Sequence, residues 1–270
     1  MFVVSLALTL LGTAPPVVTP ETSVGFLIVQ PHGRGDARSA RGFLDDLATA
    51  LKGAWPETAA APDLQGRYHV SVADALASVA GDRPAFGLVS TGFLDAHGDE
   101  LKLEILARPE LPPPARAVHH LVGLADSSAG DAVAARNLAG LRLAGRACGE
   151  LGFLEERVLS GFTGLSEAEL LVESRVLSAL RRLRRGQADV VILRDADWQR
   201  LVRLDKTDGL TLLHESPTTP ESPWVSFGEH PLAEDFSRAL ITMGETEAGR
   251  RVLKRMNLVG FVPVTEEPSR

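Results

Sequence analysis

The feature that most constrains the fold is a regular alternation of short apolar runs with amphipathic helical segments over residues 24–90. The run VGFLIVQ at residues 24–30 is apolar almost throughout, which is typical of a strand buried on both faces in a parallel sheet. In the segment that follows, Phe43, Leu47 and Leu51 recur at helical spacing and predict an amphipathic helix. GRYHVSV and RPAFGLVS predict two further strands, with the helical pattern VADALASVAG between them. This order predicts a parallel sheet with right-handed crossovers.

Three consecutive prolines at residues 112–114 mark the end of this first series, because they impose a stiff, extended segment. In the second series AVHHLVGLA, LRLAG and DVVILRD predict strands, and DAVAARNLAG and ELGFLEERVL predict the helices between them. Ser166 and Glu169 have the spacing of a capping box, so we expect a long helix from there to Arg185. Two helical patterns, PLAEDFSRALITM and ETEAGRRVLKRM, and the strand-like LVGFVPV close the chain. The sequence therefore predicts two α/β lobes.

The charge balance argues against a nucleic-acid partner. The chain has 270 residues and a formal net charge of −7, whereas nucleic-acid-binding proteins are usually basic or carry a basic face. A local basic cluster lies off the apolar stripe of a predicted helix and at its C-terminal end, where the helix dipole favours cations; it comprises Arg181, Arg182, Arg184 and Arg185. We interpret the cluster as a solvated helix end, with a contact to an acidic partner as the alternative.

The N-terminus resembles an export signal. Residues 2–11 form a nearly unbroken apolar run, which is too short for a membrane span of about 20 residues. Small residues and then Pro15 and Pro16 follow this run, so we expect a signal peptide that is cleaved near Ala14. A first buried strand or an anchor are the alternatives. After cleavage the protein would be periplasmic or secreted, with no stable insertion in the membrane.

Motifs for catalysis, metals and cofactors are weak. The single cysteine, Cys148, excludes an internal disulfide and a CxxC metal site. His119 and His120 are neighbours in a predicted strand and point to opposite faces, which argues against a shared metal ion. The stretch GRGDARSA has Arg38 in place of the third glycine of a dinucleotide fingerprint, and GLVSTG lacks the spacing of a nucleophile elbow. We therefore expect no metal, no cofactor and no enzymatic activity.

Several phrases together resemble the extracytoplasmic solute-binding proteins of the type II periplasmic fold, in particular the phosphate, phosphite and phosphonate components of ABC transporters. They are ALRRLRRGQADVVIL, ARNLAGLRLAG, LTLLHESPTTPESPWVSF and ITMGETEAGRRVLKRMNLVGFVPV, which occur in the order typical of that family. The resemblance covers roughly residues 24–265. It implies two Rossmann-like α/β lobes with mixed or parallel sheets, joined by two extended hinge crossings, with a ligand held between the lobes.

The resemblance also implies a division of the chain. Residues 1–19 would be the signal peptide and leader, and residues 266–270 a polar tail. Residues 20–118 and 216–265 would form lobe I, and residues 119–215 would form lobe II. The hinge strands would lie at the edges of lobe II, over residues 118–124 and 210–215.

The candidate ligand-binding residues come from a general rule for open α/β sheets, in which the cleft lies beyond the carboxyl ends of the strands. The rule nominates the stretch 145–148. It also nominates eight residues at the ends of other strands, which are Gln30, His32, Ser90, Thr91, Arg194, Asp195, Glu215 and Ser216. Arg194 is suited to an anion, and the hydroxyls of Ser90 and Thr91 are suited to donate hydrogen bonds. The alternative for Arg194 is a surface ion pair with Asp195 or Asp197.

One departure from the family pattern bears on the ligand. Phosphonate binders of this family carry a Ser-Thr-Ser-Gly-type loop at a helix N-terminus in the second lobe, where exposed N–H groups bind the anion. The matching stretch here reads GRACGELGFL and places the acidic Glu150 at that point. A neutral, cationic or apolar ligand therefore fits as well as a phosphonate.

From these observations we expect a monomeric binding protein that captures a small ligand by hinge closure. Its partner would be an ABC-type transporter permease or a sensor. Two alternatives stay open because a fold does not settle function. One is a hydrolase or transferase on the same fold, which would use Ser90 or an acid in the cleft. The other is a carrier for a lipid or another apolar ligand.

Overall fold

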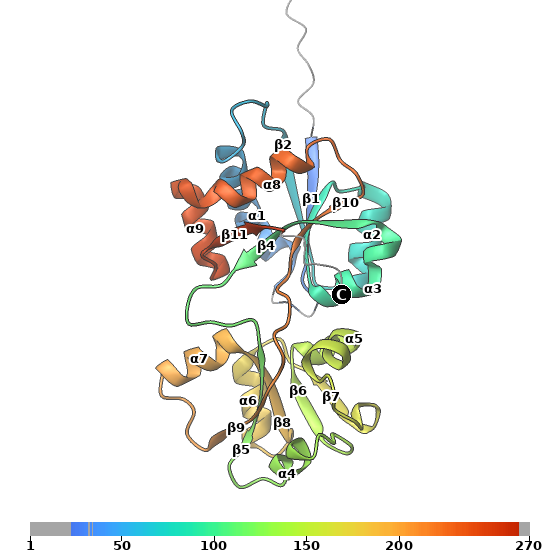
Figure 1. The fold of residues 1–270 in the computed structure, drawn as a ribbon, viewed down its shortest axis with the longest axis vertical. Coiled ribbons are helices and arrows are strands. Elements are labelled where there is room, and N and C mark those ends of the chain that lie inside the picture. The colour runs from blue at the N-terminus through green and yellow to red at the C-terminus, as the bar shows by residue number, and fades with distance from the viewer. Residues whose placement is uncertain (1–22, 32, 34, 265–270) are drawn as a thin grey trace, which may run out of the picture.

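Two separate β-sheets organise the chain, as the computed structural model shows (Figure 1). The structure describes residues 23–31, 33 and 35–264. The predicted signal peptide at residues 1–19, the polar tail at residues 266–270 and the candidate residue His32 lie outside the described residues.

The first sheet has six strands in the order β11-β4-β10-β3-β1-β2. Its strands are β1 (Ser23–Val29), β2 (Asp63–His69), β3 (Phe86–Val89), β4 (Leu103–Glu110), β10 (Trp224–Phe227) and β11 (Gly260–Pro263). β1 pairs in parallel with β2 and β3, whereas β10 and β11 pair antiparallel with their neighbours. The parallel arrangement predicted from residues 24–90 is therefore one half of a mixed sheet.

Helices cover both faces of this sheet, and the side chains of β1 show why its sequence is apolar throughout. Phe26 and Ile28 pack on one face with helices α1 (Ala37–Gly53), α8 (Ala233–Thr242) and α9 (Glu247–Met256). Leu27 and Val29 pack on the other face with α2 (Val72–Asp82) and α3 (Thr91–Leu101). Alternate side chains of a strand point to opposite faces, so a strand in this position needs apolar residues at every position. We call this sheet with its helices lobe I.

The second sheet has five strands in the order β7-β6-β8-β5-β9. Its strands are β5 (His119–Leu124), β6 (Arg142–Gly145), β7 (Glu169–Val172), β8 (Val190–Arg194) and β9 (Leu210–Glu215). Its helices are α4 (Ala129–Ala134), α5 (Leu151–Phe153), which continues as a π-helical turn over Leu154–Val158, α6 (Val176–Arg184) and α7 (Asp195–Arg203). β6 is parallel to β7 and β8, and β5 is antiparallel to β8 and β9. We call this part lobe II.

Two extended crossings join the lobes (Figure 1). The first crossing, residues 111–118, connects β4 to β5, and the second crossing, residues 216–223, connects β9 to β10. The two crossings are bonded to each other, because the N–H of Thr219 donates to the carbonyl of Ala117 at 2.6 Å. The chain therefore leaves lobe I once and returns once, through neighbouring segments.

The predicted capping box is wrong. Leu165–Glu167 is a 3₁₀ turn, and the residues after it form β7, which pairs with β6 in the register Leu143↔Leu170. The helix begins only at Val176, and its N-cap residue Arg175 makes no side-chain capping bond. Pairing with a neighbouring strand outweighs the local helix signal here. In α6 the buried residues are Ala179, Leu180 and Leu183. Of the predicted basic cluster, Arg181, Arg184 and the C-cap residue Arg185 are exposed, as expected of a solvated helix end, whereas Arg182 is partly buried and ion-paired with Glu173.

Candidate ligand-binding site

A pocket of about 430 Å³ lies between the two lobes, where the carboxyl ends of strands from both sheets meet. Lobe I contributes residues that follow β1 and β3 together with Tyr68 of β2, and lobe II contributes residues that follow β6, β7 and β8. The second crossing adds Thr219–Ser222 to the wall. His119 reaches the same pocket although it begins β5, because β5 is antiparallel and pairs His119 with Arg194 at the end of β8.

Arg146 is the most distinctive group in the pocket. It follows β6 and is partly buried. Its backbone carbonyl accepts the N–H of Gly149, but its guanidinium makes no hydrogen bond or ion pair with the residues that the structure describes. Burial, followed by the neighbouring guanidinium of Arg194, lowers the pKa of Arg146, while the negative charges of Glu150 and Asp197 act in the opposite direction. A desolvated cation without a partner is costly for a folded protein, so this residue is a candidate for contact with a bound group.

Gly145 allows the backbone that carries Arg146 to approach β8 closely. A Cβ atom at this position would lie 2.6 Å from the carbonyl oxygen of Ile192, a distance that no side chain tolerates. The glycine therefore lets the end of β6 pack against β8 and sets where Arg146 enters the pocket.

Glu150 connects the lobes across the pocket wall. Ser90 is the N-cap of α3, where its Oγ accepts the N–H of Phe93 at 3.1 Å and donates to Oε2 of Glu150 at 2.6 Å. A Cβ on Gly92 would overlap the Glu150 carboxylate, so glycine makes room for that carboxylate. The carboxylate thus lies at the positive end of α3, where a negative charge is favoured.

Arg194 forms a second contact between the lobes. Its guanidinium is ion-paired with Glu221 of the second crossing, and not with Asp195 or Asp197. The crossing is held against lobe I at this point, because Thr91 Oγ1 donates to the carbonyl of Pro220 at 2.8 Å. The surface pair proposed as an alternative for Arg194 is therefore replaced by a pair in the pocket wall.

His119 lines the pocket beside these arginines. Burial, and then the electrostatic interactions with Arg194, His120 and Arg146, lower the pKa of His119 to about 3. The imidazole is therefore neutral at physiological pH and offers a hydrogen bond and no charge.

Seven of the eight residues nominated from the sequence lie in the described part of the chain, and the structure divides them into two groups. Gln30, Ser90, Thr91 and Arg194 line the pocket, and so do Gly145, Arg146 and Ala147 of the nominated stretch 145–148. Asp195, Glu215 and Ser216 do not line it. His119 and the pocket-lining residues Thr219–Ser222 of the second crossing were not nominated from the sequence, because the antiparallel direction of β5 and the path of the crossing are not visible in local patterns.

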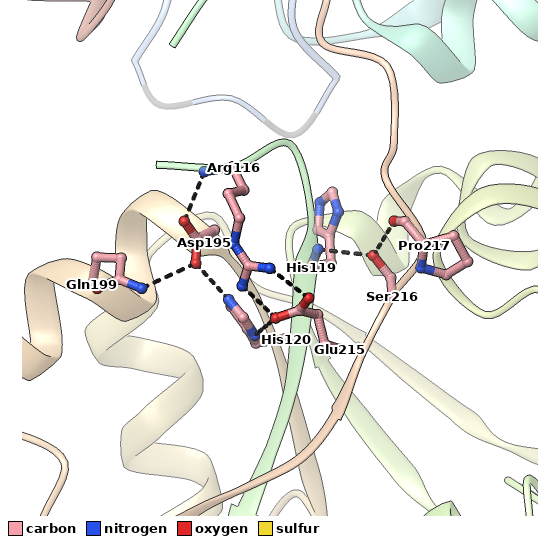
Figure 2. Close-up of polar contacts among 8 residues, drawn as sticks. All are labelled: Arg116, His119, His120, Asp195, Gln199, Glu215, Ser216 and Pro217. Atoms are coloured by element: carbon pink, nitrogen blue, oxygen red, sulfur yellow. Dashed lines mark hydrogen bonds and ion pairs between the residues drawn. The ribbon is translucent and has the colours of Figure 1, made fainter. Parts of the chain in front are cut away.

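Asp195, Glu215 and Ser216 belong instead to a polar network at the base of the crossings (Figure 2). The carboxylate of Asp195 accepts the N–H of Arg116 at 2.8 Å and lies 2.7 Å from Nε2 of His120. Glu215 receives two hydrogen bonds from the guanidinium of Arg116. Ser216 Oγ accepts the N–H of His119 at 2.9 Å and donates to the carbonyl of Pro217.

The described residues contain no group of three or more His, Cys, Asp or Glu side chains placed to hold a metal ion. Within the same part of the chain, no helix is both long and apolar enough to cross a membrane. Burial raises the pKa of Cys148 to about 12, so its thiol is unreactive at neutral pH.

Comparison with solved structures identifies the architecture. XAC2383 from Xanthomonas citri, solved bound to ATP, matches with a TM-score of 0.68 at 16% identity, covering 91% of this chain and 92% of that chain. PhnD1 from Prochlorococcus marinus, in complex with methylphosphonate, matches with a TM-score of 0.61 at 12% identity, covering 91% and 94%. A binding protein component of an ABC phosphonate transporter, PA3383 from Pseudomonas aeruginosa, matches with a TM-score of 0.60 at 15% identity, covering 90% and 82%.

The fold is that of the type II periplasmic solute-binding proteins. Residues 173–268 also match the sequence model of a family described as ABC transporter, phosphonate, periplasmic substrate-binding protein. These findings confirm the resemblance and the fold class predicted from the sequence. No curated protein sequence matches the chain.

Proposed function

We propose that this protein is a periplasmic solute-binding protein that holds a small ligand with an anionic group in the interlobe pocket and presents it to an ABC-type transporter. The observation that carries the proposal is Arg146, whose desolvated guanidinium faces the pocket and makes no hydrogen bond or ion pair with the described residues. A phosphonate, phosphate or carboxylate group would supply the missing charge and up to two hydrogen bonds in the planar geometry that a guanidinium favours.

Three polar groups of the pocket are already engaged with protein atoms, and Arg200, which also lines the pocket, is exposed, so the partly buried Arg146 is favoured as the main anchor. The hydroxyls of Ser90 and Thr91 already donate to Glu150 and to the carbonyl of Pro220, and the charge of Arg194 is neutralised by Glu221. A ligand that used these groups would first have to displace a protein atom. Arg146 needs no such displacement, so the anionic group of the ligand is assigned to it.

The wider setting agrees with a role in transport. The match over residues 173–268 is to a family of periplasmic substrate-binding proteins, and two of the solved neighbours carry ligands with phosphorus-centred anions, ATP and methylphosphonate. The expected signal peptide would place the protein in the same compartment. Closure would follow the pattern of proteins whose two lobes rotate about connecting segments.

The proposal is tested by calorimetric titration of the wild type with methylphosphonate, inorganic phosphate and ATP, and with a neutral and a cationic compound as comparators. We expect at least one anion to bind and Arg146→Gln to weaken that binding by about 10- to 100-fold, the loss typical of a hydrogen bond to a charged group. Arg203→Ala removes an exposed arginine of α7 that does not line the pocket, and should bind as the wild type does.

Two results would contradict the proposal. One is binding only of the neutral or cationic compound. The other is equal affinity of the wild type and Arg146→Gln for the anion. Mass spectrometry of small molecules that co-purify from the native host provides an independent check on the ligand.

A further inference from the structure

A ring of four residues ties the crossings to lobe II (Figure 2); it consists of Arg116, His120, Asp195 and Glu215, and Arg116 takes part with its backbone N–H and its guanidinium. Asp195, the first residue of α7, is fully buried, and its carboxylate receives the N–H of Arg116, Nε2 of His120 at 2.7 Å and Nε2 of Gln199 at 3.3 Å. Burial acts to raise the pKa of Asp195, but these hydrogen bonds outweigh it and hold the pKa below its ordinary value. Asp195 is therefore a buried anion whose place depends on its donors.

Glu215 closes the ring from the other side. It ends β9, and its carboxylate accepts two hydrogen bonds from the guanidinium of Arg116, one of them at 2.7 Å. Nδ1 of His120 lies 3.9 Å from the same carboxylate and is buried without a hydrogen bond to any described residue. Arg116 and His120 thus each face both carboxylates, one from the first crossing and one from β5.

The ring lies where both crossings join lobe II. Arg116 lies on the first crossing, and Glu215 is the last residue before the second crossing. The N–H of Asp195 donates to the carbonyl of Val118, which fixes the start of α7 against the end of the first crossing. Two pocket residues are direct chain neighbours of ring members, since Arg194 precedes Asp195 and His119 precedes His120.

We propose that Arg116, His120, Asp195 and Glu215 are positioning residues: they fix the angle at which the crossings leave lobe II and thereby hold Arg194 and His119 at the pocket. The statement about the pocket rests on the proposed function, whereas the statement about the angle between the lobes does not. None of the four side chains lines the pocket, so their effect on a ligand acts through their neighbours.

The exposed half of the ring is the part that can be altered without leaving a buried charge unpaired. The side chains of Arg116 and Glu215 are 54% and 36% exposed, whereas those of His120 and Asp195 are 2% and 0% exposed. We therefore choose Arg116→Ala and Glu215→Gln as test variants. The matched control is Arg142→Ala, which removes a similar two-bond pair with Asp189 between the amino ends of β6 and β8, away from the crossings.

The first measurement is the distance between the lobes in the ligand-free protein. Cysteines introduced as Glu100→Cys on α3 and Ser160→Cys after α5 would carry spin labels on exposed positions of the two lobes. The native Cys148 is buried and its pKa is raised to about 12, so it does not compete for the label. Pulsed electron–electron double resonance should give a broader or shifted distance distribution in Arg116→Ala and Glu215→Gln than in the wild type. The distribution in Arg142→Ala should be unchanged.

The second measurement is the affinity for methylphosphonate, or for whichever anion the wild type binds, together with the melting temperature. We expect both test variants to lose about tenfold in affinity, in the range of effects transmitted through packed networks, and to melt within the range of the control. A purely structural role of the ring would lower the melting temperatures and leave the distances and the affinity unchanged.

The two measurements separate failure of this inference from failure of the proposed function. Distance distributions identical to those of the wild type and the control would overturn the positioning role, whatever the ligand. A wild type that binds no anion while the test variants still change the distances would overturn the proposed function and leave the positioning role supported.

Discussion

Two arginines at the ends of neighbouring parallel strands show that the surroundings of a side chain decide whether it is available to a ligand. Arg194 ends β8 and is ion-paired with Glu221, whereas Arg146 follows β6 and forms no ion pair among the residues that the structure describes, although the charges of Glu150 and Asp197 act on it from a greater distance. The sequence rule treats the two alike, because both follow a strand. The positions of acidic residues far away in the sequence decide which arginine is ion-paired within the protein and which can bind a ligand.

At the same scale, His119 makes stability depend on pH. Its pKa is about 3 in the folded protein against an ordinary value of 6.5, so the unfolded chain binds a proton that the folded protein does not. The contribution of His119 to the free energy of unfolding is therefore fully present well above pH 6.5. It is lost progressively as the pH falls from 6.5 towards 3. His119→Gln should reduce the loss of unfolding free energy between pH 7 and pH 5 by about 2 kcal/mol.

Urea unfolding of the wild type and His119→Gln at pH 7, 6 and 5 measures this difference. Above pH 5 most carboxylates are ionised in both states, so the comparison isolates the histidine. Equal pH slopes for the two proteins would show that the imidazole is not held neutral by its site.

At the scale of elements, α3 of lobe I faces α5 of lobe II and the turn that follows it (Figure 1). One contact is the bond of Ser90 to Glu150 in the pocket wall, and the other is an ion pair of Asp95 with Arg157, at 3.1 Å between Oδ1 and Nη2. Neither Asp95 nor Arg157 lines the pocket. This ion pair therefore favours approach of the lobes without touching a ligand.

We expect Asp95→Asn to lower ligand affinity only slightly, by at most about fivefold, because exposed ion pairs contribute up to about 1 kcal/mol. The effect should disappear at high salt, where surface charges are screened. Calorimetric titration at low and high salt measures it, and the double variant with Asp95→Arg and Arg157→Asp should restore the affinity. A loss that persists at high salt would mean that Asp95 acts on the pocket in another way.

For the whole molecule, the proposed function requires that one ligand contacts both lobes. A ligand that binds only the folded protein at 100 times its Kd adds about 2.7 kcal/mol to the free energy of unfolding. If it bridges the lobes, small-angle X-ray scattering should also show a smaller radius of gyration with ligand than without. Stabilisation with no change in radius would place the ligand on one lobe and would exclude capture by closure.

The sequence predicts much of the architecture because its strongest signals are local. Apolar runs such as that of β1 and the amphipathic pattern of α1 depend on the period of the backbone and on burial, and both can be read within one segment. Local patterns in the sequence do not predict β4, α3 and α7, and they place the start of α6 too early. β4 includes Arg108 and Pro109, which do not fit a strand pattern, and the segment of β7 follows a capping signal that favours a helix. In both segments, pairing with a distant strand outweighs the local preference.

The sequence by itself determined that the chain folds as two α/β lobes, and it nominated strand ends where a site could form. Only the tertiary structure decided which of these residues face one pocket and which tie the crossings to lobe II. Ser90 meets Glu150 and Arg116 meets Glu215, pairs that are 60 and 99 residues apart in the chain. Strand periodicity is a property of neighbouring residues, but the partner of a charge depends on how distant segments are brought together, and no local pattern contains that information.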